Sequence, residues 1–412
     1  MTSIGLDEVL SHISLREGRP FVQWKGVRIE SVFQPIYGLP QKRAVGFEAL
    51  VRGRSPDGNI VFPGELFKMA RSEEEAVFLD RLVRAVHLLN FQPYKTLPVW
   101  LFLNISPDVA SRGRKYGTYF GGLLKVTGVP GHQVVVEIVE SGIPDTARLE
   151  EAVGYYRGIG CLIAVDDFGA GLSNFDRIWT LKPEFVKLDR LMVVNSVLRK
   201  DIRRVLPEIV SLTRTSGSLV LMEGIETEEE AMLVLETDID FVQGFYFGRP
   251  EETAHIGTPP TLLNILDAHR LVEKKDREPI EISRLMGQFR DIIFTVREDE
   301  IEEKLLPVFF EFPSVVRYFV LDGSGCQVGA NQSKPGHGLV QDLRFLPLAQ
   351  TEKADWSRRT YFREALRKPG RVYLSSPYLS ATGAHMCRTL SLADERDAGL
   401  RVFCLDIDWT NR

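Results

Sequence analysis

The sequence predicts an irregular (β/α)8 barrel, a TIM-type α/β fold, followed by a smaller α+β domain. The chain has 412 residues, more than one hydrophobic core usually supports, so two domains are expected. Strand and helix patterns alternate between residues 29 and 247, an order typical of a parallel sheet. Eight strand patterns favour a barrel, although periodicity alone also fits a doubly wound open sheet. Only Gly38–Arg43 joins the first two strands, which is too short for a parallel crossover, so one strand should run antiparallel.

The predicted strands are short runs of β-branched, aliphatic and aromatic residues. In chain order they are Ile29–Tyr37, Val45–Val51, Val99–Ile105, Val134–Val139, Leu162–Asp167, Phe185–Leu188, Leu219–Gly224 and Phe241–Phe247. Helical patterns separate most of them, at Pro63–Phe91, Pro107–Leu124, Asp145–Arg157, Leu191–Thr215 and Thr227–Glu236.

We expect the barrel over residues 1–255, a helical linker over 256–306 and a second domain over 307–412. The prolines of Thr258-Pro259-Pro260 break the strand pattern. The charged segment that follows has a helical pattern, which fits either a helix that connects the two domains or a helix at a dimer interface. The lack of sustained heptad repeats favours the connecting helix. Beyond it, a hairpin, a helix around Trp356–Leu366 and further strands indicate an antiparallel sheet with helical cover.

The composition is that of an ordinary folded protein, with 44% hydrophobic and 26% charged residues. The net charge of -5 provides no electrostatic footprint for duplex nucleic acid. The four cysteines lack the spacing of a disulfide framework or a metal finger, and Cys161 and Cys404 lie in apolar runs that predict packed thiols. Without a signal-peptide core or a run of roughly 18 apolar residues, we expect a cytoplasmic location and no membrane insertion.

Polar side chains stand at the carboxyl ends of seven predicted strands: Glu48, Asn104, Glu137, Asp166 with Asp167, Lys187, Glu223 and Gln243. In a barrel these ends converge on the face where active sites lie. A lone Glu there is more often a solvated strand end or a helix N-cap, but seven such strands in a row favour a shared site. The adjacent acids Asp166 and Asp167 repel each other and lose hydration unless a cation offsets the cost, so they predict a metal.

An ordered set of motifs resembles the EAL-domain phosphodiesterases, which hydrolyse the bacterial second messenger cyclic di-GMP. The motifs are Phe33-Gln34-Pro35-Ile36, Phe47-Glu48-Ala49-Leu50-Val51-Arg52, Asn104-Ile-Ser-Pro107, Glu137-Ile-Val-Glu140-Ser141, Asp166-Asp167-Phe168-Gly169, Lys187-Leu-Asp189-Arg190, Glu223-Gly-Ile-Glu226-Thr227 and Gln243-Gly244-Phe245. The family fold is a barrel with one reversed strand, in agreement with the short first connection. No Gly-Gly-(Asp/Glu)-Glu-Phe stretch is present, so synthesis of the messenger is not indicated.

The resemblance implies two divalent ions, for which hard oxygen ligands suit Mg²⁺ or Mn²⁺. The first ion would be held by Glu48, Asn104, Glu137 and Asp166. The second would be held by Asp166 and Asp167, with Glu223 reaching it directly or through water. Two such ions about 4 Å apart clamp an in-line displacement at phosphorus, and the expected product is the linear dinucleotide pGpG.

Further roles also follow from the resemblance. Lys187 would position the attacking water and stabilise developing charge, and Gln243 would stand near the water or the second ion. Glu140 would hold the loop after Asp167 in its productive shape. The implied contacts to cyclic di-GMP are Gln34, Glu48, Leu50, Arg52, Asp189 and Glu226.

Two of these residues also fit a structural role, and the chain differs from the family pattern at three positions. Arg52 suits a phosphate through its planar fork, but Gln34 and Arg52 also fit rim hydrogen bonds or salt bridges. The chain departs from the family pattern at Val139, Ala170 and Leu172, which affects loop dynamics and rate. No ligand position is lost, which favours an enzyme over the alternative, a catalytically weak receptor of cyclic di-GMP that signals through a protein partner.

The C-terminal part resembles PAS/Cache sensor domains. The similarity lies in Asp355-Trp-Ser-Arg-Arg359-Thr-Tyr361-Phe362, Tyr373-Leu-Ser-Ser-Pro377-Tyr378 and Leu405-Asp406. Its aromatic and polar side chains fit either a small-ligand pocket or the core contacts of a dimerisation domain; they are Trp356, Arg359, Tyr361, Tyr373 and Tyr378. We expect a homodimer in which this domain, with or without a small-molecule ligand, regulates the barrel.

Overall fold

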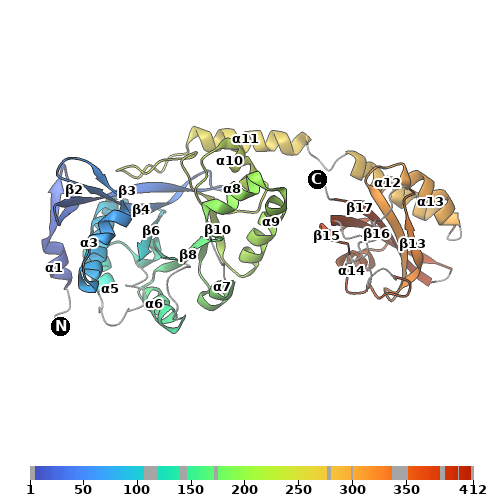
Figure 1. The fold of residues 1–412 in the computed structure, drawn as a ribbon, viewed down its shortest axis with the longest axis horizontal. Coiled ribbons are helices and arrows are strands. Elements are labelled where there is room, and N and C mark those ends of the chain that lie inside the picture. The colour runs from blue at the N-terminus through green and yellow to red at the C-terminus, as the bar shows by residue number, and fades with distance from the viewer. Residues whose placement is uncertain are drawn as a thin grey trace. The chain divides into compact units, whose positions relative to one another are not determined.

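The computed structural model describes residues 5–105, 119–139, 146–170, 175–275, 280–297, 300–335, 351–380, 386–397 and 399–409. The chain divides into two compact units, Met1–Val272 and Glu273–Arg412 (Figure 1). Helix α11 (Pro260–Lys275) begins in the first unit, whereas α12 (Ile280–Thr295) and α13 (Ile301–Phe310) belong to the second. The region expected as a linker is therefore divided between the two units.

Eight strands of the first unit close into a barrel, in the order β3, β4, β6, β7, β8, β9, β10 and β11, with β11 paired back to β3. β3 runs antiparallel to both β4 and β11, and the other neighbouring pairs are parallel. The predicted reversed strand is confirmed, and the closed order excludes an open sheet. The bounds are β3 Val27–Gly38, β4 Arg43–Arg54, β6 Trp100–Ile105, β7 Val134–Val139, β8 Leu162–Phe168, β9 Phe185–Leu188, β10 Leu219–Met222 and β11 Phe241–Val242.

One apolar residue from each barrel strand forms an interior cluster: Ile36, Val45, Phe102, Val135, Ala164, Phe185, Leu221 and Phe241. The larger core lies between the strands and the surrounding helices, where α3 alone contributes a long buried stripe. The interior cluster is the layer on which the polar ends of the strands are built.

Two helices that were predicted as single are each divided. Residues 63–91 form α2 (Pro63–Lys68) and α3 (Glu73–Phe91), because the Ser72 side chain caps α3 by accepting a hydrogen bond from the Glu75 amide. Residues 190–215 form α8 (Arg190–Leu198) and α9 (Lys200–Thr215), because Arg199 is extended, with φ −131°. Among the described residues, the remaining barrel helices are α5 (Tyr119–Thr127), α6 (Thr146–Gly158), α7 (Phe175–Leu181) and α10 (Glu228–Leu235). The first part of the helix predicted over Pro107–Leu124 lies outside the described residues.

Some short elements were not expected from the sequence. Helix α1 (Leu6–Ser11) and strands β1 (Ile13–Arg16) and β2 (Arg19–Trp24) precede the barrel, and β5 (Ile60–Val61) follows β4. The hairpin of β1 and β2 extends the sheet beyond β3, and β5 extends it beyond β4. The β3–β4 ribbon is thus the centre of a larger antiparallel surface.

The second unit is an antiparallel sheet with helices on both faces (Figure 1). Its strand order is β13, β12, β17, β16 and β14, and β15 also pairs with β16. Along β17, Phe403 and Leu405 pack with residues of α12 and α13, whereas Val402 and Cys404 pack with residues of α14. The bounds are β12 Val315–Asp322, β13 Gln327–Ser333, α14 Thr360–Arg367, β14 Tyr373–Leu374, β15 Tyr378–Leu379, β16 Met386–Arg396 and β17 Gly399–Asp408.

Cys161 and Cys404 are buried, as their apolar surroundings predicted, and all four cysteines are free thiols. Among the described residues, no helix combines the length and the hydropathy that a membrane span requires.

Candidate metal site at the barrel rim

On six strands, a polar side chain lies two residues beyond the member of the interior cluster. Residues two apart point to the same side of a strand, so these side chains gather above the interior cluster, and we call this carboxyl-end group the rim. The pairs are Phe102 and Asn104, Val135 and Glu137, Ala164 and Asp166, Phe185 and Lys187, Leu221 and Glu223, and Phe241 and Gln243. Glu48 joins the rim from β4, where it lies opposite Gln34 of β3.

A bulge in β8 explains how two adjacent acids reach one site. In a regular strand Asp166 and Asp167 would point to opposite faces. The pairing between β8 and β9 shifts between Val165 and Phe168, and Asp167 adopts the left-handed region, with φ 55°. Both carboxylates can thereby approach Glu223, and one oxygen from each of the three acids lies within 4.8 Å of the others.

Lys187 lies at the centre of the rim carboxylates. Its Nζ atom is 2.5 Å from a carboxylate oxygen of Glu137 and of Glu223. The same atom is 3.0 Å from Asp166 Oδ1 and 3.8 Å from Glu48 Oε2. The Lys187 side chain is 1% exposed and that of Glu137 is not exposed at all, so the ammonium provides buried positive charge to a cluster of acids.

Burial and mutual repulsion control the protonation of the rim. Burial raises the pKa of Glu137 well above its ordinary value, and the pKa of Glu223 is raised by burial in the same way. Burial alone would lower the pKa of Lys187, but the surrounding carboxylates raise it well above its ordinary value, so the lysine stays charged. Burial and the neighbouring Asp166 raise the pKa of Asp167.

Two amides orient Glu48. Asn104 donates a hydrogen bond from Nδ2 to Glu48 Oε1 at 2.9 Å, and Gln243 donates from Nε2 to Glu48 Oε2 at 2.8 Å. Asn104 is exposed and its carbonyl oxygen remains available as a ligand, whereas Gln243 is buried. Both residues therefore act on the same carboxylate.

The rim residues fit divalent cations. Oxygens of Glu48, Glu137 and Glu223 lie within 4.8 Å of one another and form a second group beside that of the aspartates. Both oxygens of Glu137 and one of Glu223 are buried, and within the described residues their close polar contact is with Lys187 Nζ, at 2.5 Å from one oxygen of each. Buried carboxylate oxygens of this kind are ligands for hard cations such as Mg²⁺, Mn²⁺ or Ca²⁺. In this arrangement Glu223 belongs to both groups.

The expected substrate contacts on β3 and β4 share one face of the ribbon, which we call the open face. Gln34 lies opposite Glu48, and Leu50 and Arg52 follow at alternate positions. Arg52 is half-buried and donates from Nη1 to the carbonyl of Val51 at 2.9 Å. Burial lowers the pKa of Arg52 despite the opposing influence of Glu48.

Two other expected contacts have structural partners. The Asp189 carboxylate caps α8 by accepting a hydrogen bond from the Leu191 amide at 2.8 Å. Glu226 forms an ion pair with Arg190. Glu140 and Leu172 lie outside the described residues, as does the side chain of Val139.

Sequence reasoning missed the reason for Gly244. This glycine follows Gln243 and has φ +156°, and a Cβ atom there would overlap the backbone of Ile225. The glycine brings the chain after β11 against the segment after β10, where the Ile225 amide donates to the Gln243 carbonyl at 3.1 Å. A glycine directly after a rim residue was the feature of the sequence that could have indicated this close approach of two backbone segments.

In the second unit, four of the five predicted pocket residues line one small cavity, at Trp356, Arg359, Tyr361 and Tyr378. The cavity also contacts Arg317, which pairs with the fully buried Asp406. Its volume of about 20 Å³ has room for about one water molecule. Tyr373 packs in the adjoining apolar cluster.

The barrel is the part of the chain that matches a known protein family. The model of the EAL domain matches residues 23–250. The probable cyclic di-GMP phosphodiesterase PdeN of Escherichia coli (strain K12) is 27% identical over 248 residues, which cover 58% of this chain and 47% of PdeN. The chain thus spans about half the length of that relative.

Two further proteins extend the comparison. The uncharacterized EAL-domain containing protein YkuI of Bacillus subtilis (strain 168) is 26% identical over 377 residues, or 87% of this chain and 90% of YkuI. Its crystal structure, in complex with substrate c-di-GMP and calcium, covers 93% of this chain and 96% of YkuI, with 24% identity and a TM-score of 0.77. Klebsiella pneumoniae BlrP1, in a manganese and cyclic di-GMP complex, covers 54% of this chain and 56% of that chain, with 26% identity and a TM-score of 0.50.

The closed barrel with one reversed strand, the acids at its rim and the family match over residues 23–250 agree with one another. Together they establish that this chain belongs to the EAL domain family.

Proposed function

We propose that the protein is a metal-dependent phosphodiesterase that hydrolyses cyclic di-GMP to linear pGpG. The observation that carries the proposal is the meeting of five carboxylates at the rim, of which four contact Lys187; they belong to Glu48, Glu137, Asp166, Asp167 and Glu223, and all but Asp167 contact the lysine. A site with this charge repels an anionic phosphodiester unless cations reverse the local field. Relatives named as cyclic di-GMP phosphodiesterases, such as PdeN, support the choice of substrate.

Two divalent ions, Mg²⁺ or Mn²⁺, are the proposed cofactors. Glu48, Glu137 and Glu223 would hold one ion and Asp166, Asp167 and Glu223 the other, with Asn104 adding its amide oxygen. When bound, such ions supply Lewis-acid stabilisation of phosphoryl oxygens and lower the pKa of water. The calcium and manganese in the complexes of YkuI and BlrP1 support divalent ions in general.

The side chains of the protein would bind the substrate and orient the metal ligands. Lys187 stays protonated, so it can donate hydrogen bonds to a phosphoryl oxygen as negative charge develops there. Gln243 and Asn104 fix the orientation of Glu48, and a carboxylate held in this way needs no rearrangement during the reaction. Gln34, Leu50 and Arg52 on the open face would hold the substrate beside the rim.

The test is incubation of the purified full-length protein with cyclic di-GMP and Mg²⁺, Mn²⁺, Ca²⁺ or EDTA, followed by chromatography of the nucleotides. We expect pGpG with Mg²⁺ or Mn²⁺ and none with EDTA. Product formation in EDTA contradicts the metal requirement. Binding of cyclic di-GMP without product in any metal would instead identify a receptor.

We further propose that the second unit regulates the barrel, that the chain forms a homodimer and that it acts in the cytoplasm. The antiparallel sheet covered by helices on both faces supports a sensor-type unit. Its cavity of about 20 Å³ requires that any metabolite open the site on binding. A thermal-shift screen with small metabolites tests this, and a dimer is tested by sedimentation; no stabilisation by any ligand favours a purely structural unit.

A further inference from the structure

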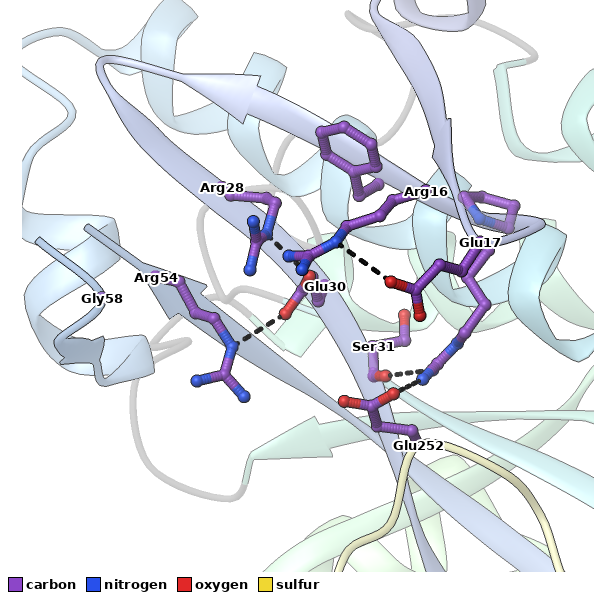
Figure 2. Close-up of a pocket in the computed structure, with 11 residues that line it drawn as sticks. Arg16, Glu17, Arg28, Glu30, Ser31, Arg54, Gly58 and Glu252 are labelled. Carbon is purple, nitrogen blue, oxygen red and sulfur yellow. Dashed lines mark hydrogen bonds and ion pairs between the residues drawn. The ribbon is translucent and has the colours of Figure 1, made fainter. Parts of the chain in front are cut away.

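An arginine-lined cavity of about 360 Å³ lies where β1, β2, β3 and β4 meet (Figure 2). We call it the arginine pocket, and its principal lining residues are Arg16, Arg19, Phe21, Arg28, Glu30 and Arg54. Its volume is within the range of pockets that hold small molecules. None of these residues takes part in the proposed hydrolysis.

The arginine pocket has an excess of positive charge. Four arginines face three glutamates, Glu17, Glu30 and Glu252, which leaves one net positive charge. The side chains of Glu17 and Glu252 are 85% and 63% exposed, so water screens them, whereas that of Glu30 is 23% exposed. An anion that enters the cavity therefore meets mainly guanidinium groups and one carboxylate.

Arg28 and Arg54 hold donors ready for such an anion. They lie opposite each other on β3 and β4 and flank Glu30 (Figure 2). Each contacts Glu30 through Nε, at 2.7 Å for Arg28 and 3.1 Å for Arg54. Their terminal Nη groups make no hydrogen bond to any residue in the described part of the chain. Two guanidinium groups of this kind match the oxygens of a phosphate.

Phe21 adds an aromatic wall. Gln23 of β2 lies opposite Arg28, and residues two apart share a face, so Phe21 is on the same side of the sheet as Arg28. Phe21 is half-buried and lines the cavity. An aromatic ring provides a surface on which any nucleobase can stack. The cavity thus combines a phosphate end with a base end.

The arginine pocket is separate from the rim. Glu48 and Arg54 are on the open face of β4, six residues apart, which corresponds to about 20 Å of strand. One phosphate cannot contact both places at that separation. Arg52, which lies opposite Glu30, stands between the two places, so a phosphate held by Arg28 and Arg54 is distinct from a phosphodiester at the rim.

We propose that the arginine pocket is a second nucleotide site, which binds a phosphorylated nucleoside. The phosphate accepts hydrogen bonds from the Nη groups of Arg28 and Arg54, and the base stacks on Phe21. The site does not depend on the proposed hydrolysis, because its ligand is neither cleaved nor in contact with the rim.

The test is calorimetric titration of the full-length protein, in Mg²⁺, with guanosine 5′-monophosphate, guanosine and inorganic phosphate as probes. We expect the monophosphate to bind at least about tenfold more tightly than either of the other two, which is about 1.4 kcal/mol. Equal binding of guanosine removes the role of the arginines. Equal binding of inorganic phosphate shows a simple anion site and overturns the nucleotide assignment.

Substitutions test whether the monophosphate binds in the arginine pocket or at the rim. The double variant R28Q/R54Q should weaken binding of the monophosphate at least about tenfold. Asp167→Asn at the rim and Arg203→Gln, whose exposed ion pair with Glu236 is outside the pocket, should leave it unchanged. Loss of binding in the Asp167 variant, with retention in the double variant, places the ligand at the rim and overturns the proposal.

The substitution Glu30→Gln should change the affinity for the monophosphate in the opposite direction. It removes the negative charge that competes with the ligand and keeps one oxygen, which is enough to accept the hydrogen bond that Arg54 Nε donates to Glu30 Oε2. We expect binding of the monophosphate to strengthen about tenfold, because a repulsive charge at hydrogen-bonding range is lost. Misfolding cannot produce this gain, and unchanged or weaker binding contradicts the proposed phosphate position.

Discussion

Replacing Lys187 with methionine should destabilise the metal-free barrel more than any exposed charge substitution. The ammonium is buried and lies 2.5 to 3.8 Å from four carboxylates. Removal of one partner from a buried ion pair costs about 3–5 kcal/mol, and with four partners we expect the upper part of that range. Domains of this type have total stabilities of about 5–15 kcal/mol, so the loss is a large fraction.

The assay is native-state hydrogen exchange of β9 and β10 in EDTA, which reports local opening free energies without requiring two-state unfolding. Lys25→Met is the matched control, because Lys25 is exposed and its partners, the Glu75 carboxylate at 2.6 Å and the Met69 carbonyl at 2.9 Å, can bond to water when the ammonium is removed. At one Mg²⁺ concentration, the Lys187 variant should also gain more stability than the wild type, since no ammonium competes for the carboxylates. Equal effects of the two substitutions in EDTA would refute the idea that the lysine neutralises the rim.

The remaining predictions concern pH, ligand orientation and the second unit. Burial raises the pKa of Glu137 and Glu223 well above 4.5, so their contribution to stability is present at a pH below 4.5 and is lost as the pH rises through the raised pKa values. The metal-free barrel should therefore become less stable as the pH rises above 4.5; hydrogen exchange in EDTA checks this, and a rise in stability contradicts it. Gln243→Ala should reduce metal affinity or turnover about 10–100-fold by releasing a rim carboxylate, as measured by Mn²⁺ titration and product assay; unchanged values contradict the orienting role. Arg317→Met should destabilise the second unit by about 3–5 kcal/mol, since Asp406 would keep the hydrogen bond from Thr389 but would remain buried without a counter-charge; calorimetry that shows an unchanged second-unit transition contradicts this.

The barrel and its rim were predictable because they follow from period-two patterns. Phe185 and Lys187, for example, occupy successive inward positions of one strand, and the sequence alone shows that spacing. The reversed strand was predictable because the length of Gly38–Arg43 limits the connection.

Features that depend on single backbone conformations were not predictable. Apolar periodicity continues past Ser72 and Arg199, so the helix breaks there were missed. The bulge at Asp167 and the close approach of Gly244 to another segment arise from tertiary contacts that no local pattern contains. Nor did the sequence show that Lys187 would contact so many acids at once.

The reversed strand has a consequence for how ligand preference can change. β3 and β4 have 12 residues each, whereas β9 and β10 have 4, so the pair projects well past the closed cylinder. The side chains of its open face stand on hydrogen-bonded strands instead of on loops. Substitutions at alternate positions of this overhang can alter which molecules dock there while leaving the closure of the cylinder intact.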